Sequence, residues 1–397
     1  MARRHLPAVF MRGGTSKALM VHRHDLPAER ADWDEIFLRA MGTPDPNGRQ
    51  LNGMGGGVSS LSKVCVLSRS ARSDADIDYT FAQVMVKDAH VDYGGNCGNM
   101  SSAVGPFAVD EHLLEVADGQ ATVRIYNTNT DKIIHSTFPV SDAQAVEAGD
   151  LAIPGVAGTG ARIRLDFLSP GGATTGRLLP TGNVIDRLDV PGIGPVEVSM
   201  VDAANACVLV EARALGLTGT EMPDALERDP VIMERLSAIR LQASVAMGIA
   251  RTLNEARTRT VVPFVGFVAP PMDARTLSGD SIAAGAVDLT ARMLSNGQLH
   301  RALPLTASLC IAVAASIEGT VAWRARQASG GASHRRSDGR SDGGKGNGSG
   351  DDALRIAMPS GVLTVGAQVE SGNGEWNALR GSFFRTARRL FDGSVYY

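Results

Sequence analysis

Cysteine is scarce in this chain, which has four cysteines among 397 residues. Cys65, Cys97, Cys207 and Cys310 show neither a C-x-x-C spacing nor another arrangement typical of metal ligands. We therefore expect reduced thiols in a cytoplasmic protein, with no metal centre.

Long apolar runs are also absent. No segment approaches the roughly 18 uninterrupted apolar residues of a membrane span. The opening residues Met1–His5 are basic, but the apolar run after them ends at Arg12, which is too short for the core of a signal peptide. We expect a soluble protein that is not exported and has no membrane partner.

Neither sign of charge prevails, since 39 Lys and Arg residues face 42 Asp and Glu residues, for a net charge of −3 and a pI near 6.3. This balance gives no reason to expect nucleic acid as a partner, but it is compatible with a small site for an anionic ligand. Apolar residues make up 44% of the chain, so core size is not limiting. The length suits two or three domains of ordinary size.

Short β-branched stretches punctuated by glycine and proline predict strands, and helices are fewer. Asp32 and Glu35 form a capping-box pattern at a helix start, and residues 229–249 carry a longer helical period. The predicted fold class is mixed α/β (α+β). Strands are expected at 63–67, 82–86, 121–126, 133–140, 196–201, 207–211, 261–268 and 361–365.

Two candidate helices, 100–109 and 305–315, are apolar nearly all round, so we expect other structure to wrap each of them. Their spacing, on the order of 205 residues, is about half the chain and fits two similar domains better than a solenoid. By itself the repeat is as compatible with chance as with duplication. Cys310 lies on the order of 10 Å inside the second helix. The counterpart of Cys97 therefore falls near Ala302 or Leu303.

Residues 327–352 are rich in glycine, serine, aspartate and arginine, with Ala328 and Ala332 as the only apolar residues. Such a segment buries too little surface to offset its ordering entropy. We expect a disordered surface loop that interrupts a domain, because strand-like sequence resumes at Leu354.

The segment Gly94–Ala103 places Cys97 among glycines, just before a run of small residues that predicts a helix start. Unpaired N–H groups and the positive end of a helix dipole lower the pKa of a thiol there and attract anions. The segment therefore offers both a proton donor and a seat for a carboxylate.

The segment Arg12–Lys17 combines a guanidinium, flexible glycines, two hydroxyls and an ammonium. These groups suit a carboxylate or a phosphate, although the upstream glycine spacing of a Walker loop is missing. A simple turn is an equally good interpretation.

The glycine-rich segment Gly53–Lys63 leads into a predicted strand, with Lys63 at its entrance. A lysine can act as a base where it is partly desolvated. The alternative is a solvated lysine beside a flexible loop.

Three further places are weaker candidates. Pro180–Asn183 and Pro359–Gly361 contain ordinary turn residues. His300 and Arg301 precede the second apolar helix, where an imidazole or guanidinium can meet a carboxylate, but a lone histidine is more often structural.

The chain resembles the PrpF family over almost its whole length, because five segments occur in the order seen in that family. They are Phe10–Lys17, Gly53–Lys63, Gly95–Asn99, Pro180–Asn183 and Arg385–Arg389. The family includes 2-methylaconitate, aconitate and methylitaconate isomerases and oxalomesaconate tautomerases.

The resemblance implies a diaminopimelate-epimerase-like fold, in which two pseudo-symmetric domains each wrap a β-sheet around a central helix and the active site lies in the cleft between them. We expect domains at 1–187 and 188–397, with the last strand able to cross back to the first domain. The chain departs from the family pattern at Phe264, at Met358 and in its long loop at 327–352, which leaves the choice of substrate open.

Diaminopimelate-type epimerases use two facing thiols, whereas this chain offers Cys97 alone. Together with the family's chemistry, this favours Lys63 as the base and Cys97 as the group that positions the substrate or returns a proton. The predicted activity is a cofactor-independent allylic proton transfer that isomerises a small unsaturated di- or tricarboxylic acid, 2-methylaconitate or aconitate. Substrate contacts are expected from Arg12, Gly14, Thr15, Ser16, Lys17, Ser59, Ser60, Asn96, Gly98, Asn99, Ser101, His300 and Ser360.

The resemblance implies neither a metal nor an organic cofactor, and it favours a homodimer. Three alternatives stay open. The protein is a methylitaconate delta-isomerase or 4-oxalomesaconate tautomerase of the same family, a non-catalytic carboxylate-binding accessory protein, or an amino-acid epimerase, against which the missing second thiol weighs.

Overall fold

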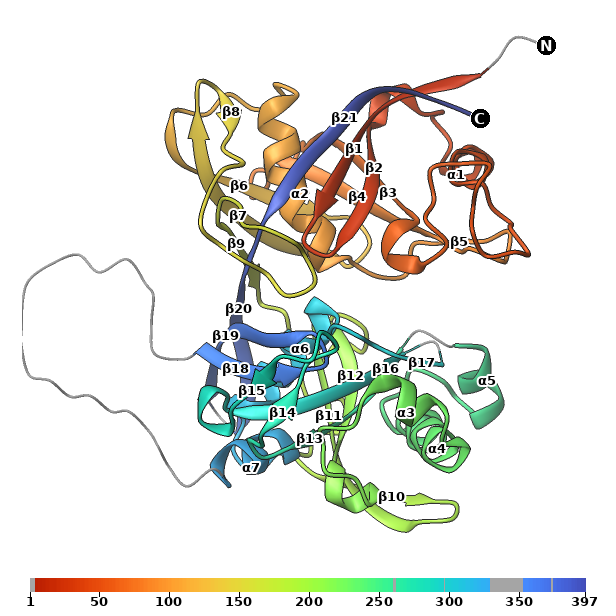
Figure 1. The fold of residues 1–397 in the computed structure, drawn as a ribbon, viewed down its shortest axis with the longest axis vertical. Coiled ribbons are helices and arrows are strands. Elements are labelled where there is room, and N and C mark those ends of the chain that lie inside the picture. The colour runs from red at the N-terminus through yellow and green to blue at the C-terminus, as the bar shows by residue number, and fades with distance from the viewer. Residues whose placement is uncertain (1–3, 260–261, 296, 329–352, 373) are drawn as a thin grey trace, which may run out of the picture. The chain divides into compact units, whose positions relative to one another are not determined.

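The computed structural model describes residues 4–259, 262–295, 297–328, 353–372 and 374–397 (Figure 1). The chain divides into two compact units. Unit 1 contains Met1–Ser169 and Ser382–Tyr397, and unit 2 contains Pro170–Gly381. The boundary therefore precedes the one expected after residue 187, and the last strand, β21, belongs to the first unit. The loop predicted at 327–352 lies outside the described residues from 329 onward.

Unit 1 is a mixed sheet with two α-helices. The helices are α1 (Trp33–Met41) and α2 (Gly98–Asp110). The strands are β1 (His5–Gly13), β2 (Ser16–His22), β3 (Lys63–Arg69), β4 (Ile77–Val84), β5 (Val91–Asp92), β6 (Gly119–Asn127), β7 (Lys132–Ser141), β8 (Gln144–Ala145), β9 (Ile163–Leu168) and β21 (Ala387–Tyr396).

The strands of unit 1 surround α2. This helix contacts β1, β2, β3, β6, β7, β8, β9 and β21. It tolerates contact on every side because eleven of its residues, from Gly98 to Val109, are buried and none of those is charged. The other face of β1, β2, β3 and β4 packs against α1, where Ile36 and Phe37 meet Leu19 and Val64. A strand with α2 on one side and α1 on the other thus sends alternate side chains to two different cores.

Unit 2 has the same plan around α6 (Leu305–Ser316), which contacts β11, β12, β19 and α7. The other helices are α3 (Pro223–Glu227), α4 (Pro230–Ala246), α5 (Leu253–Thr258) and α7 (Val321–Gln327). The strands are β10 (Asp186–Val190), β11 (Gly194–Ala203), β12 (Asn205–Glu211), β13 (Phe264–Ala269), β14 (Ala274–Arg275), β15 (Ser281–Ile282), β16 (Leu289–Ser295), β17 (Gln298–Leu299), β18 (Ala353–Met358), β19 (Gly361–Gly372) and β20 (Glu375–Arg385), which pairs with β19 and passes into unit 1 at Ser382.

Strand pairing repeats between the two units. In unit 1 the pairs β1–β2, β2–β3, β3–β4, β4–β6 and β6–β7 run antiparallel, parallel, antiparallel, parallel and antiparallel. In unit 2 the pairs β11–β12, β12–β13, β13–β16, β16–β18 and β18–β19 follow the same series. The helix α2 follows β5 and precedes β6, just as α6 follows β17 and precedes β18. The duplication inferred from the two apolar helices is therefore present in the topology.

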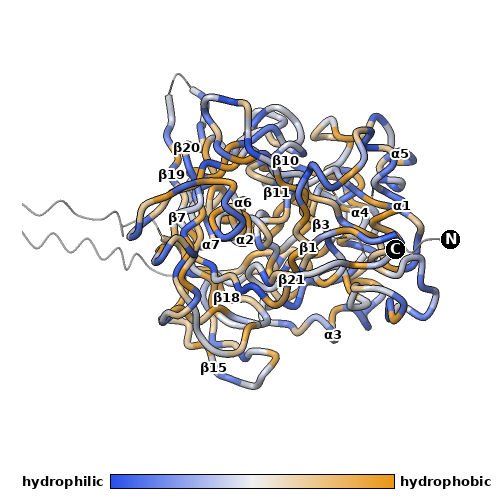
Figure 2. Tube along the Cα trace, turned by 90° about the horizontal axis from the view of Figure 1, so that it is seen from above, coloured by the Kyte–Doolittle hydropathy of each residue, from blue (hydrophilic) through white to orange (hydrophobic). Residues whose placement is uncertain are grey.

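Polar and apolar residues are interleaved along the chain (Figure 2). Most of the predicted helices and strands are present. Two local predictions are wrong. The strand predicted at 82–86 is Ile77–Val84, because the alternation of buried and partly buried residues starts at Ile77. The capping box at Asp32 does not form, because Asp32 ends a 3₁₀ turn and its side chain makes no capping bond. Asp229 does cap α4, by accepting from the backbone N–H groups of Val231 and Ile232.

Within the described residues, no single helix is long and apolar enough to cross a membrane. The helices α6 and α7 meet the length and composition of a span only when taken together, across a bend of 70°.

Candidate active site

The turn between β1 and β2 is tight and lies against the start of α2. Gly13 pairs with Ser16, so only two residues make the turn, and Gly14 has a φ of +51°. A Cβ atom on Gly14 would lie 2.2 Å from Oδ1 of Asn99, and the Gly14 N–H donates to the carbonyl of Thr386 at 3.0 Å. Only glycine fits this position, both for its backbone conformation and for its space.

Arg12 holds this turn together. Its Nη1 donates to the carbonyl oxygens of Gly14 at 3.0 Å and Thr386 at 2.9 Å. Burial lowers the pKa of Arg12. Thr15 joins the turn to α2, because its hydroxyl accepts from Nδ2 of Asn99 at 3.1 Å. Ser16 is buried beside it.

Lys17 lies on the opposite face of the sheet from α2. It lies on the same face of β2 as Leu19 and Val21, which belong to the core that contains α1. Its Nζ sits 5.5 Å from the ring centroid of Phe10, a residue of the same core. The structure therefore does not bring Lys17 to the start of α2.

Cys97 is the N-cap of α2 and is partly exposed, with an extended backbone and no side-chain capping bond. Its carbonyl accepts from the backbone N–H of Ser101 at 2.9 Å and from the Ser101 hydroxyl at 3.1 Å. The N–H groups of Gly98, Asn99 and Met100 donate to no group in the part of the chain that the structure describes. These are the donors that a helix offers to an anion.

Asn96 and Ser101 brace the approach to the helix. The Asn96 Oδ1 accepts from the Ser101 hydroxyl and from Nδ2 of Asn127, both at 3.3 Å. Asn127 is fully buried, and its own Oδ1 accepts from the backbone N–H of Thr130 at 3.0 Å. Ser101 is likewise fully buried. In this structure Asn96 and Ser101 act on the backbone that carries Cys97.

Lys63 opens β3 and is buried, with 7% of its surface exposed. Its ammonium donates to Oε1 of Gln83 and lies 5.0 Å from the ring centroid of Phe81. It makes no ion pair with any residue that the structure describes. Lys63 is therefore largely shielded from water.

Gln83 is directly opposite Lys63 in the β3–β4 pair. Its Nε2 donates to the carbonyl oxygens of Ser59 at 3.0 Å and Ser62 at 2.9 Å, which turns Oε1 toward the lysine. Ser59 and Ser60 lie in the 3₁₀ turn that precedes β3. Gln50 holds the glycine-rich loop before this turn, because its Oε1 accepts from the Gly57 N–H at 2.9 Å and its Nε2 donates to the hydroxyl of Ser62 at 2.7 Å.

The buried thiol of Cys65 is subject to the charges of both Lys63 and Cys97. Cys65 is two residues after Lys63 and faces the same side of β3. Burial raises the pKa of Cys65, the nearby Cys97 adds to this effect, and Tyr79 and Lys63 oppose it. Tyr79 lies next to Cys65, with 3.8 Å between its hydroxyl oxygen and the sulfur. Lys63 and Cys97 therefore both lie within electrostatic range of one buried group.

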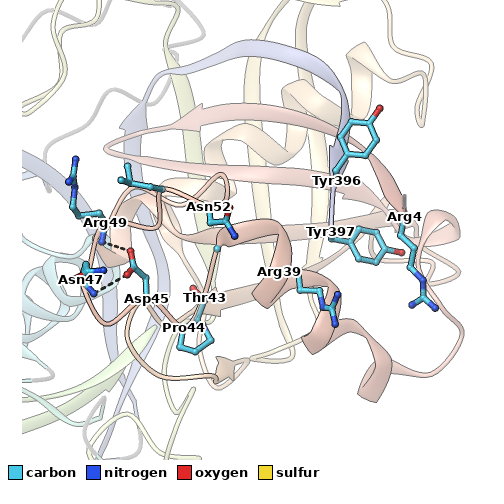
Figure 3. Close-up of a pocket in the computed structure, with 12 residues that line it drawn as sticks. Arg4, Arg39, Thr43, Pro44, Asp45, Asn47, Arg49, Asn52, Tyr396 and Tyr397 are labelled. Atoms are coloured by element: carbon cyan, nitrogen blue, oxygen red, sulfur yellow. Dashed lines mark hydrogen bonds between the residues drawn. The ribbon is translucent and has the colours of Figure 1, made fainter. Parts of the chain in front are cut away.

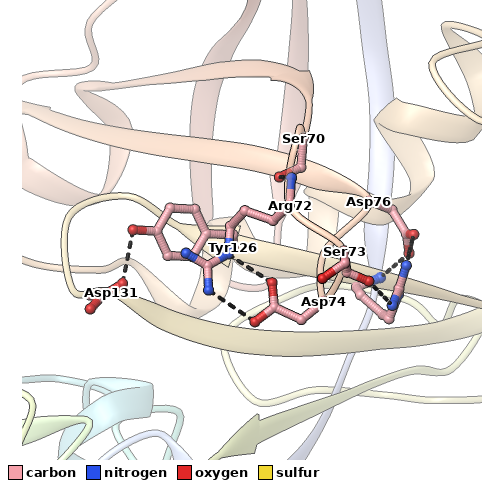
Figure 4. A network of polar contacts seen from close by, with 8 residues as sticks. Ser70, Arg72, Ser73, Asp74, Asp76, Tyr126 and Asp131 are labelled. Atoms are coloured by element: carbon pink, nitrogen blue, oxygen red, sulfur yellow. Dashed lines mark hydrogen bonds and ion pairs between the residues drawn. The ribbon is translucent and has the colours of Figure 1, made fainter.

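Arg385, at the end of β20, reaches the same helix start. Its Nε donates to Oδ1 of Asn99 at 3.2 Å, and its Nη1 donates to the carbonyl of Phe384 at 2.9 Å. Other arginines of unit 1 have carboxylate partners: Arg72 pairs with Asp74 (Figure 4), and Arg124 pairs with Asp76.

His300 and Ser360 lie in unit 2. Nε2 of His300 is 2.6 Å from the hydroxyl of Ser295, and its ring is 6.2 Å from that of Phe264. The buried Ser360 Oγ has no hydrogen-bond partner among the described residues.

The start of α6 has no thiol. Its N-cap is Pro304, which is the counterpart of Cys97, one or two residues beyond the position expected from the sequence. Cys310 is buried inside the helix, with its sulfur 3.3 Å from the carbonyl oxygen of Val201. The contact between Thr15 and Asn99 has an equivalent, because Asn205 donates to the hydroxyl of Thr306 at 2.7 Å.

Sequence reasoning missed Gln83, Asn127 and Arg385 as parts of this site. The segment Arg385–Arg389 was a family motif without an assigned role, and no local pattern marked the other two residues. All three reach the site through strand pairing or tertiary contact.

A pocket of 1040 Å³ lies elsewhere in unit 1 (Figure 3). None of the predicted site residues lines it. Its walls include Arg4, Arg39, Asp45, Asn47, Arg49, Leu51, Tyr396 and Tyr397. Among the described residues, no three His, Cys, Asp or Glu side chains gather in a way that could hold a metal ion.

The fold is that of an epimerase-like α/β protein. A hydroxyproline epimerase from Agrobacterium vitis aligns with a TM-score of 0.51 over 100% of this chain and 94% of that one, at 12% identity. At this identity the likeness concerns the fold alone.

The chain belongs to the PrpF family, because the family model described as "PrpF protein" matches residues 3–397. It is 38% identical to a 2-methyl-aconitate isomerase of Shewanella oneidensis, over 98% of this chain and 96% of the relative, and 39% identical to a 3-methylitaconate isomerase of Eubacterium barkeri, over 98% and 97%. A 4-oxalomesaconate tautomerase of Pseudomonas putida is 36% identical over 100% and 97%. A solved methylitaconate delta-isomerase aligns with a TM-score of 0.81 at 38% identity, over 100% of this chain and 96% of that one. The chain is therefore an isomerase of this family, as the sequence predicts.

Proposed function

We propose that this isomerase moves a proton between two carbons of a small unsaturated di- or tricarboxylic acid, with 2-methylaconitate or aconitate as the substrate. The observation that carries the proposal is the buried Lys63, which makes no ion pair in the described chain, and the partly exposed N-cap thiol Cys97 offers a second group for proton transfer. Relatives named for 2-methylaconitate, methylitaconate and oxalomesaconate support this class of substrate.

The reaction begins when neutral Lys63 removes an allylic proton. The C–H bond breaks, an N–H bond forms, and the electron pair spreads over the double bond and the adjacent carboxylate. Open N–H groups at the start of α2 stabilise this charge. Cys97 then gives a proton to the other allylic carbon, which shifts the double bond or allows its geometry to change. Return of a proton from Lys63 to Cys97, directly or through water, restores the starting state.

The single thiol favours this reaction over two-thiol epimerisation. An epimerase of that type needs an acid or base on each face of one carbon, whereas the counterpart of Cys97 is Pro304. A binding protein without activity would need neither a buried lysine nor a thiol. Methylitaconate and 4-oxalomesaconate remain alternative substrates of the same chemistry.

A panel assay tests the proposal. Purified protein is incubated with 2-methylaconitate, cis- and trans-aconitate, methylitaconate and oxalomesaconate, and products are followed by absorbance and NMR. We expect turnover of at least one acid and loss of turnover in Lys63→Ala. Lys87→Ala, which removes an exposed lysine, serves as the control and should retain full activity. Turnover of none of the acids, or full activity in Lys63→Ala, would contradict the proposal.

We also infer a cytoplasmic homodimer, which rests on the family resemblance and on the reduced thiols expected from the sequence. Light scattering after size exclusion tests the dimer, since a monomer mass across the micromolar range would overturn it.

A further inference from the structure

Arg385 is a buried cation without a counter-charge. Arg385 is only 6% exposed, and no carboxylate of the described residues pairs with it. Its acceptors are the amide oxygen of Asn99 and the carbonyl of Phe384, and its Nη2 has no partner in the described chain. Burial lowers the pKa of Arg385 to about 10. Such a charge destabilises the empty protein unless an anion binds there.

Two other buried arginines have evident structural roles. Arg240 uses both terminal nitrogens to bond the carbonyls of Ala256 and Arg259, which ties α4 to the end of α5. Arg292 donates to the backbone carbonyl of Glu221, and burial lowers the pKa of Arg292 while the negative charge of the Glu221 side chain opposes this effect. Arg385 ties no second element by its terminal nitrogens, because Nη1 reaches only its chain neighbour.

Arg385 packs against the β1–β2 turn and the start of α2. Gly13 and Gly14 place no side chain between the β1–β2 turn and Asn99, and a Cβ on Gly14 would lie 3.2 Å from Cδ of Arg385. Asn99 is the second residue of α2, whose first N–H groups are open. A guanidinium and open helix donors therefore meet around one residue, and both favour negative charge.

Arg12 is the cation that the sequence favours for this role, but it makes structural hydrogen bonds to the backbone. Its Nη1 bonds two backbone carbonyls and fixes the turn against Thr386. Arg12 thus fixes the turn and has the negative charge of Glu147 nearby, whereas Arg385 has no carboxylate partner among the described residues.

We propose that Arg385 binds one carboxylate of the substrate at the start of α2, with Asn99 holding the guanidinium in place. The site then requires a carboxylate at this point and rejects a neutral amide or ester there, because the neutral group leaves the buried cation unpaired. This inference rests on the proposed function for the kind of ligand, a di- or tricarboxylate.

Binding of a non-reacting acid tests the inference without relying on catalysis. Propane-1,2,3-tricarboxylate has no double bond to move, and its affinity is measured by titration calorimetry. We expect Arg385→Gln to weaken binding by about 10- to 100-fold, as for loss of a charge-assisted bond. The affinity of Arg385→Lys should lie between those of the native protein and Arg385→Gln, because lysine keeps the charge but lacks the planar guanidinium. Arg388→Gln removes an exposed arginine three residues on and should change affinity less than about twofold.

Comparison with amides of the same acid identifies the carboxylate. The 1-amide and the 2-amide of propane-1,2,3-tricarboxylate each lack one charge. The amide that replaces the carboxylate bound by Arg385 should weaken binding to the native protein but have little further effect in Arg385→Gln. Equal additional losses for both amides in Arg385→Gln would overturn the proposal.

Thermal unfolding separates this role from a structural one. Removal of an unpaired buried cation should leave the melting temperature of Arg385→Gln unchanged or higher. A lower melting temperature together with native affinity for the tricarboxylate would show that Arg385 only supports the fold. If the native protein binds the tricarboxylate through Arg385 but isomerises none of the panel acids, the proposed function fails and this inference stands. If the native protein isomerises an acid and Arg385→Gln keeps the native KM, this inference fails and the proposed function stands.

Discussion

Gln83 fixes the position of the Lys63 ammonium. Its Oε1 accepts a hydrogen bond from Nζ of Lys63, and its Nε2 donates to two backbone carbonyls in the segment just before β3. The amide cannot turn over without losing these bonds, so the lysine always meets an acceptor and not a donor.

Loss of this amide should impair the chemical step more than substrate binding. We expect Gln83→Leu to lower kcat by about 10- to 100-fold with little change in KM, because misplacement of a base costs rate. Gln120→Leu, at an exposed position of β6, is the matched control. Unchanged kcat in Gln83→Leu would show that Lys63 does not depend on Gln83.

A methyl group at Gly14 should displace the start of α2. Gly14→Ala must adopt a φ of +51° and place its Cβ 2.2 Å from Oδ1 of Asn99. The backbone conformation alone costs about 1 kcal/mol, and the clash adds to it. Gly248→Ala is the control, because Gly248 has a φ of +73° and open space around it. Denaturant unfolding should show a clearly larger loss of stability for Gly14→Ala, and equal losses would contradict the described packing.

The Glu227–Arg301 pair should make stability depend on pH in the acid range. Hydrogen bonding from Arg301 lowers the pKa of Glu227. A lowered carboxyl pKa contributes stability that is present above its unfolded value of about 4.3 and is lost as the pH falls through the folded value. Both side chains are partly exposed, so the contribution is at most about 1 kcal/mol.

Arg301→Gln should therefore be less stable than the native protein at pH 7 and nearly as stable below about pH 4. Thermal unfolding between pH 7 and 3.5 measures this difference. Arg39→Gln, which breaks a more exposed pair with Glu35, should show a smaller effect throughout. A difference for Arg301→Gln that does not change with pH would rule out the ion pair as its source.

Cys97 should be the most reactive thiol of the chain. It is partly exposed, whereas Cys65, Cys207 and Cys310 are buried. Iodoacetamide should alkylate Cys97 first and abolish isomerisation, and propane-1,2,3-tricarboxylate should slow the reaction by occupying the site. Mass spectrometry of tryptic peptides identifies the labelled cysteine. Labelling of another cysteine at the same rate, or full activity after labelling of Cys97, would argue against its assigned role.

The large features of the fold were open to prediction because they are local in sequence. Residues 100–109 and 305–315 lack a polar face, so burial of both helices followed from composition alone, and the repeated strand pairing confirms the duplication that they suggested. The family and the epimerase-like fold are confirmed as well. The capping box at Asp32 failed because the preceding 3₁₀ turn sets a backbone conformation that a four-residue pattern does not reveal.

The proposed site was predictable only where one segment carries it. Lys63 and Cys97 stand in glycine-rich motifs, but Gln83 meets Lys63 across a strand pair, and Arg385 meets Asn99 from 286 residues away. Lys17 directly follows the buried Ser16 and yet faces the other core, because successive residues of a strand point to opposite sides. Spacing within a motif therefore did not reveal which side chains share a face.

Hydrogen exchange in heavy water tests the central claim most directly, which is that Lys63 removes the allylic proton and Cys97 returns one to the other carbon. NMR follows deuterium at each allylic carbon of the acid that is turned over. The account predicts exchange at the first carbon in the native protein and in Cys97→Ser, exchange at neither carbon in Lys63→Ala, and isomerisation in the native protein alone. Native rates of exchange and isomerisation in Lys63→Ala would contradict it.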